Sequence, residues 1–80
     1  MSSSRLHLSF PELLVERPII YEAANRFGVV PNIRRANVET HSGWVILELT
    51  GDKQAIEDAV SWFSEVGVIV NRMEGDVLES

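Results

Sequence analysis

The sequence predicts an α+β domain in which two helices cover one face of a four-stranded antiparallel sheet. Four segments alternate apolar and polar residues as strands do, and two others repeat apolar residues at the helical period. They follow one another as strand, helix, strand, strand, helix, strand. The 80 residues allow a single domain, expected over residues 5–73 with flexible ends at 1–4 and 74–80.

The first strand is expected over residues 5–10, where apolar residues alternate with polar ones, namely Leu6, Leu8 and Phe10. Pro11 ends this strand because proline has no amide to continue the ladder. In the connector that follows, we expect the apolar residues 13–15 to pack against one end of the core.

The first helix is expected to begin at Pro18, since the first helical position needs no amide donor. Its apolar stripe has helical spacing and consists of Ile19, Ile20, Ala23, Ala24 and Phe27. Gly28 ends the helix because glycine readily adopts the left-handed conformation of a C-cap.

The second strand is expected over residues 29–39, and Pro31 places it at a sheet edge. Ile33 has the opposite parity to Ala36 and Val38, so either a bulge shifts the register or Ile33 precedes the regular part. A turn over residues 40–43 leads to the strongest strand signal of the chain, over residues 44–50. There Val45, Leu47 and Leu49 alternate with Trp44, Ile46, Glu48 and Thr50.

The second helix follows Asp52, whose carboxylate is a good N-cap acceptor. Its stripe repeats the spacing of the first helix and consists of Ala55, Ile56, Ala59, Val60 and Phe63. We expect partial core burial for Trp62, which lies beside this stripe. Gly67 ends the helix, and the last strand runs from Val68 towards Met73.

This order of elements, with right-handed crossovers, corresponds to the ferredoxin-like βαββαβ arrangement. Both helical stripes then pack on the same face of the sheet. The other face has no element to cover it and includes Arg5, His7, Trp44, Ile46 and Ile69. Because uncovered apolar surface marks interaction sites, function is expected on that face.

Composition excludes several classes of function. Seven basic residues against 12 acidic ones give a net charge of −5, which disfavours a nucleic-acid partner. No apolar run approaches the ~20 residues of a membrane span, so direct membrane insertion is not expected. The absence of cysteine excludes disulfides and thiolate nucleophiles. With no signal-peptide core at the start, the sequence predicts a cytoplasmic domain.

Signatures of an enzyme are absent, and neither a metal nor a cofactor is expected. His7 and His41 lack metal-ligand spacing, no serine lies in a Gly-x-Ser-x-Gly elbow, and no glycine-rich phosphate loop occurs. Trp44 is the single aromatic residue of its strand, which suits an anchor for a dimer better than base stacking. Arg17, Arg34 and Arg35 allow a small anion site, although paired or solvated arginines are the commoner arrangement.

Several short motifs in a fixed order resemble the NIL domain family over the stretch from Leu6 to Met73. They are Leu6-x-Leu8-x-Phe10, Arg17-Pro18-Ile19-Ile20, Phe27-Gly28-Val29, Asn32-Ile33-Arg34, Leu47-Glu48-Leu49-x-Gly51, Ala55-Ile56 and Gly67-Val68-x-Val70. The resemblance implies a ferredoxin-like regulatory domain, best known at the C-terminus of ATP-binding subunits of bacterial methionine importers. There two copies associate, and methionine bound near their interface inhibits transport.

The resemblance also implies a ligand site. Asn32 matches the asparagine associated with methionine binding, although an asparagine after Pro31 also suits a turn. Ile33 and Ile46 are expected to supply an apolar slot for a thioether across a dimer. Arg34 departs from the family, which has an apolar residue there. It either turns outward, pairs with Glu39 or Glu48, or supplies a charge for an anionic ligand.

Two hypotheses follow. In the first, the chain is a non-enzymatic homodimeric domain that senses a small amino acid, methionine foremost, and regulates a transporter or another protein partner. Asn32, Ile33, Arg34 and Ile46 then bind the ligand, while Trp44 and Ile46 form the dimer interface. In the second, the chain is a protein-interaction module without a small ligand, which uses its uncovered face or its edge strand.

Overall fold

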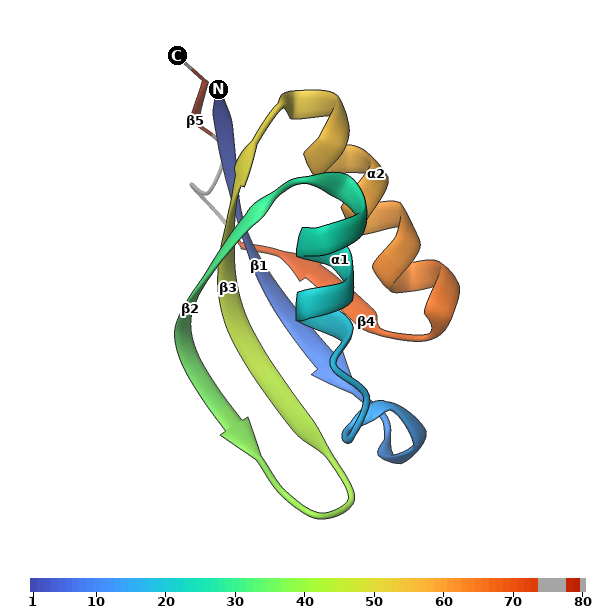
Figure 1. The fold of residues 1–80 in the computed structure, drawn as a ribbon. Helices are drawn as coiled ribbons and strands as arrows, with labels where there is room; N and C mark the ends of the chain where they lie inside the picture. The colour runs from blue at the N-terminus through green and yellow to red at the C-terminus, as the bar shows by residue number, and fades with distance from the viewer. Residues whose placement is uncertain (74–77, 80) are drawn as a thin grey trace.

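The computed structural model describes residues 1–73 and 78–79, and its elements occur in the predicted order (Figure 1). A strand, β1, is followed by a short 3-10 helix and helix α1. Strands β2 and β3 form a hairpin, and helix α2 leads into β4. The bounds are β1 Ser2–Phe10, 3-10 helix Glu12–Leu14, α1 Ile19–Phe27, β2 Val30–Val38, β3 Gly43–Gly51, α2 Lys53–Val66, β4 Ile69–Arg72 and β5 Leu78–Glu79.

The sheet has the order β2-β3-β1-β4 and every pairing is antiparallel. The two-residue strand β5 also pairs with the start of β1. Both helices lie on the same side of this sheet (Figure 1). The ferredoxin-like βαββαβ fold predicted from the sequence is therefore confirmed.

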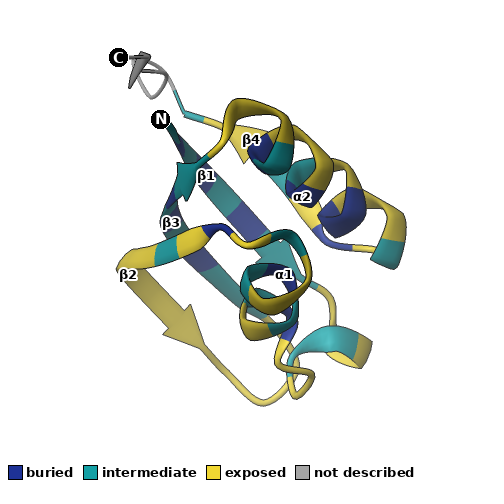
Figure 2. Ribbon diagram, turned by 45° about the horizontal axis from the view of Figure 1, so that its top comes forward, coloured by how far each residue is buried: buried dark blue, intermediate teal, exposed yellow. Residues whose placement is uncertain are grey.

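The core lies between the two helices and the central strands β1 and β3. Burial alternates along these strands (Figure 2). Because neighbouring residues of a strand point to opposite faces, every second side chain points at the helices. The largest fully buried side chains are Phe63, Leu6, Leu8, Ile19, Leu47 and Leu49. Trp62 is only 7% exposed, which is deeper than the partial burial expected for it. Its ring packs between Phe27 and Phe63, with centroid distances of 6.0 and 5.9 Å.

The start of the chain differs from the prediction. Strand β1 begins at Ser2, so residues 2–4 belong to the sheet and not to a flexible end. Ser4 is 3% exposed because it continues the inward parity of Leu6, and its hydroxyl accepts a hydrogen bond from Arg72. Serine is not apolar, so the alternation of apolar and polar residues in the sequence predicts the strand only from residue 5 onward. Of the other predicted end, residues 74–77 and 80 lie outside the described residues.

Strand β2 confirms two predictions. It is an edge strand, as Pro31 indicated. Its register against β3 shifts between Ile33 and Arg35, so the bulge is the correct one of the two alternatives and Arg34 is the extra residue. The bulge places Ile33 opposite Leu47 and Arg35 opposite Ile46.

The segment between β1 and α1 is less buried than predicted. Leu14 packs against the core, whereas Leu13 is 94% exposed because the 3-10 turn directs it to solvent. Helix α1 begins at Ile19, so Pro18 occupies the N-cap position, one place before the predicted one. Gly28 and Gly67 end the helices with φ of 71° and 111°, the left-handed conformation that the sequence predicted.

Asp52 caps α2, because its carboxylate accepts a hydrogen bond from the Gln54 amide at 3.2 Å. We expect Asp52→Ala to lower the free energy of unfolding by about 1 kcal/mol, the usual value of a side-chain cap. Chemical denaturation measures this loss. Asp52→Asn keeps an acceptor at the same place and is the matched control, so an equal loss in both variants would contradict the capping role.

Candidate functional site

The sheet surface opposite the helices is the candidate site. Because neighbouring residues of a strand point to opposite faces, the residues between the buried positions of β1 and β3 share this surface. We call it the open face. From the register, its residues are Ser3, Arg5, His7, Ser9, Val30, Asn32, Arg35, Asn37, Trp44, Ile46, Glu48, Thr50, Ile69 and Asn71. Arg34 joins them because its guanidinium reaches Glu48.

The register arranges these side chains in rows across the sheet. One row holds Asn32, Glu48 and Arg5 on strands β2, β3 and β1. The next row holds Arg35, Ile46, His7 and Asn71, and the third holds Asn37, Trp44, Ser9 and Ile69. A polar row therefore lies beside rows that carry the apolar and aromatic side chains.

An aromatic pair lies at the centre of the open face. The rings of His7 and Trp44 stack with their centroids 5.6 Å apart and their planes at 17°. Ile46 lies directly opposite His7, and Ile69 is 61% exposed on the neighbouring edge. Both stacked residues are half-buried, so the pair presents flat apolar surface to whatever approaches the sheet.

The charges of the open face differ in sign from those of the chain as a whole. Arg5, Arg34 and Arg35 are balanced there by one carboxylate, that of Glu48, among the described residues. Glu48 lies 3.9 Å from Arg34, which is a loose ion pair. Arg5 is the cross-strand partner of Glu48, yet its Nε is buried without a hydrogen-bond partner in the described part of the chain. The open face is thus locally positive although the chain carries −5.

The residues predicted to bind a ligand divide between the two faces. Asn32 is exposed and lies opposite Glu48 on the open face, where Ile46 and Arg34 also lie. Ile33 is opposite Leu47 and therefore faces the helix side, where it is 55% exposed. Ile33 and Ile46 share no face within one protomer, so a slot built from both needs a second chain. Sequence reasoning placed Arg5 on this face, which the register confirms, but did not single it out, because the missing partner of its Nε is visible only in the structure.

The three arginines considered as an anion site are not brought together. The Arg17 guanidinium lies over the Trp62 ring at 5.8 Å and pairs with Glu22 at 2.8 Å, on the helix side. The hydrogen bond from Arg17 lowers the pKa of Glu22. His41 is likewise engaged, with its Nδ1 at 2.6 Å from a carboxylate oxygen of Glu12.

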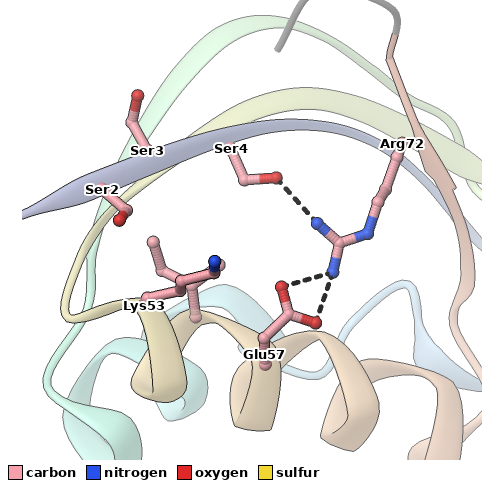
Figure 3. A pocket seen from close by; sticks show the side chains of 7 residues that line it. Ser2, Ser3, Ser4, Lys53, Glu57 and Arg72 are labelled. Atoms are coloured by element: carbon pink, nitrogen blue, oxygen red, sulfur yellow. Dashed lines mark hydrogen bonds and ion pairs between the residues drawn. The ribbon is translucent and has the colours of Figure 1, made fainter. Parts of the chain in front are cut away.

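A small cavity of about 60 Å³ lies between the start of β1 and helix α2 (Figure 3). Arg72 crosses it and donates two hydrogen bonds to Glu57, at 2.9 and 3.0 Å, and one to Ser4. Its charge is therefore already neutralised. This cluster ties β4 to α2 and β1, and no sequence pattern predicted it.

The part of the chain that the structure describes was searched for a metal centre and for a membrane-spanning helix, and neither was found there. Within residues 1–73 and 78–79, no three His, Asp or Glu side chains gather closely enough to hold a metal ion. No helix of that part of the chain is both long and apolar enough to cross a membrane.

Taken together, these features define a small ferredoxin-like domain with one uncovered, locally positive sheet face. The family model of the NIL domain matches residues 4–72, which is most of the chain. The chain belongs to the NIL domain family.

Known proteins similar to this chain include an archaeal enzyme subunit and solved structures. The chain is 36% identical over 55 residues to the L-aspartate semialdehyde sulfurtransferase iron-sulfur subunit of Methanocaldococcus jannaschii. That match covers 69% of the chain, which spans about two fifths (42%) of the relative's length. A solved C-terminal domain of an ABC transporter ATP-binding protein from Enterococcus faecalis superposes with a TM-score of 0.78 at 19% identity, covering 91% of this chain and 86% of that one.

A designed protein, Foldit4, shares the fold as well. Its TM-score is 0.62 at 14% identity, and the match covers 99% of this chain and 97% of that one. At such identities the two structures show the fold alone. A natural domain and a designed one thus reach the same arrangement of two helices on one sheet.

Proposed function

We propose that this NIL domain is a non-enzymatic regulatory domain that acts as a cytoplasmic homodimer and binds a small amino acid, with methionine as the first candidate. Its partner protein is a transporter subunit or another regulated protein. The sulfurtransferase activity named for the archaeal relative belongs to a protein of which this chain spans about two fifths.

The observation that most supports the proposal is the composition of the open face. Trp44 and Ile46 give it an apolar centre, which a second protomer would bury. Asn32 lies two strands from β1 on the same face, and its carboxamide both donates and accepts hydrogen bonds. It therefore suits either charged end of an amino acid.

A ligand held between two protomers would regulate by differential affinity. If it binds one arrangement of the dimer more tightly, it shifts the population towards that arrangement. Micromolar affinity corresponds to about 8 kcal/mol at standard state, which is ample to bias a small interface. The partner protein would then respond to the arrangement and not to the ligand itself.

A second candidate function is a protein-interaction module without a small ligand. The nine-residue edge strand β2 favours it, since an exposed edge can accept a strand from another protein. The archaeal relative is itself named as a subunit, which is compatible with such a role.

Calorimetric titration with L-methionine separates the two candidates. We expect binding heat with the natural chain and a loss of roughly tenfold or more in affinity for Asn32→Ala, because the carboxamide contact is removed. Asn37→Ala, which removes the same group two rows away, is the matched control. Unchanged affinity in Asn32→Ala would reject the site, and no heat with any amino acid would favour the interaction module.

A further inference from the structure

We infer that Arg5 is the anchor of a carboxylate subsite on the open face, and that the ligand bound there has an apolar tail lying over the His7–Trp44 stack. The inference rests on the proposed function in so far as it concerns the same face. It goes further by assigning the residue, the charged group and the length of the ligand.

The first argument is the state of the Arg5 guanidinium. Its Nε is buried and has no hydrogen-bond partner among the described residues. A buried donor without an acceptor is unfavourable, and native proteins rarely keep one without a use for it. Nε itself is covered, but the residue as a whole is only half-buried, so a ligand carboxylate meets the terminal nitrogens of the guanidinium from the open face.

The second argument is the comparison with other arginines of the chain. Arg17 and Arg72 each have a carboxylate oxygen within 2.9 Å, at Glu22 and Glu57 respectively. No carboxylate of the described residues lies within ion-pair distance of Arg5. A guanidinium presents parallel N–H groups that match the two oxygens of a carboxylate. A carboxylate ligand therefore forms stronger hydrogen bonds with Arg5 than water does.

The third argument is the arrangement around Arg5. His7 is the next residue of β1 on the same face, about 7 Å further along the strand at the usual rise per residue. Ile46 lies opposite His7, and Trp44 stacks on the His7 ring. A carboxylate at Arg5 therefore has an apolar surface within reach of a tail four to six atoms long. Aliphatic amino acids and short fatty acids have this shape.

Glu48 gives the subsite an internal competitor. It is opposite Arg5 on β3 and lies 3.9 Å from Arg34 on the other side. When no ligand is present, this carboxylate is the nearest negative charge in that row of the open face. The carboxylate of a bound ligand would pair with Arg5, and Glu48 would then pair with Arg34 alone. Removal of the Glu48 charge should therefore strengthen ligand binding.

The experiment uses the two tryptophans of the full chain in NMR titrations. The indole N–H of Trp44 reports on the open face, and that of Trp62, buried on the helix side, is the internal control. The probes are L-methionine, L-methioninamide, which lacks the carboxylate, and hexanoate, which lacks the ammonium. The variants are Arg5→Gln, Arg5→Lys, Glu48→Gln and, as a matched removal of a helix-side arginine, Arg26→Gln.

We expect L-methionine and hexanoate to shift the Trp44 signal and not the Trp62 signal, and L-methioninamide to bind at least roughly tenfold more weakly. Arg5→Gln should lose roughly tenfold or more in affinity, and Arg5→Lys should lose less because it keeps the charge. Glu48→Gln should gain roughly two- to fivefold. Arg26→Gln should bind as the natural chain does. Preserved dispersion of the spectrum shows that each variant is folded.

Three other outcomes are decisive. Equal affinity for L-methionine in the natural chain and Arg5→Gln would overturn the subsite while the proposed amino-acid sensor stands. Binding of hexanoate through Arg5 without binding of L-methionine would support the subsite and reject the amino-acid part of the proposed function. Failure of both carboxylates to shift the Trp44 signal would overturn the subsite, and the homodimer would still be judged separately by sedimentation.

Discussion

Replacement of Phe63 by alanine is expected to lower the free energy of unfolding by about 3–5 kcal/mol. Phe63 is fully buried and packs against Trp62 on α2. Removal of the ring loses its transfer free energy and leaves a cavity that the two helices and the sheet cannot close fully. Since a chain of this size has a total stability of roughly 4–12 kcal/mol, this loss is a large share of the total.

Urea denaturation followed by circular dichroism measures this loss. Leu13→Ala is the matched control, because Leu13 is also apolar but 94% exposed, and its truncation should change little. A loss below about 1 kcal/mol in Phe63→Ala would mean that the helices do not pack on the sheet as described.

The second large effect is expected at the proposed dimer interface. Trp44→Ala should raise the dissociation constant of the homodimer by about 30-fold or more, since central aromatic residues contribute about 2 kcal/mol or more to interfaces. The ring lies over the open face and outside the buried core, so the variant should remain folded. Sedimentation over a range of protein concentrations measures the dissociation constant.

Tyr21→Ala is the control for this measurement. Tyr21 is an aromatic residue of α1, 68% exposed, and it does not belong to the open face. Its truncation should leave the dissociation constant unchanged. A natural chain that sediments as a monomer at every concentration would contradict the dimer, and an equal effect of both variants would place the interface elsewhere.

Most of the fold follows from local patterns. The stripes ending at Phe27 and Phe63 fix the two helices, and the glycines after them fix where the helices end. The alternation around Leu47 fixes the central strand. These signals are strong because apolar spacing, capping and turn chemistry agree with one another. Pro31 also predicts where its strand lies in the sheet, since a residue without an amide donor suits an edge strand.

The parts that sequence reasoning missed depend on partners distant in the chain. Ser4 lies at an inward position of β1, and the partner that satisfies its buried hydroxyl is Arg72, far along the sequence. The 3-10 turn that exposes Leu13 has no periodic signal. Arg5 stands out only once its neighbour across the sheet is known to be Glu48, which itself lies close to Arg34. Polar contacts of this kind join residues at no regular separation in the sequence, so no sequence pattern predicts them.

The make-up of the outer strand β2 limits how copies of the domain can assemble. An exposed edge strand can pair with the edge strand of another copy, and repeated pairing of this kind produces fibres. Here the adjacent cations Arg34 and Arg35 would repel the same two arginines in a neighbouring copy, a repulsion that a strand without cations from another protein would not meet. Polymerisation along the edge is thereby discouraged. Association through the open face stops at two copies, because the contact buries that face in both of them.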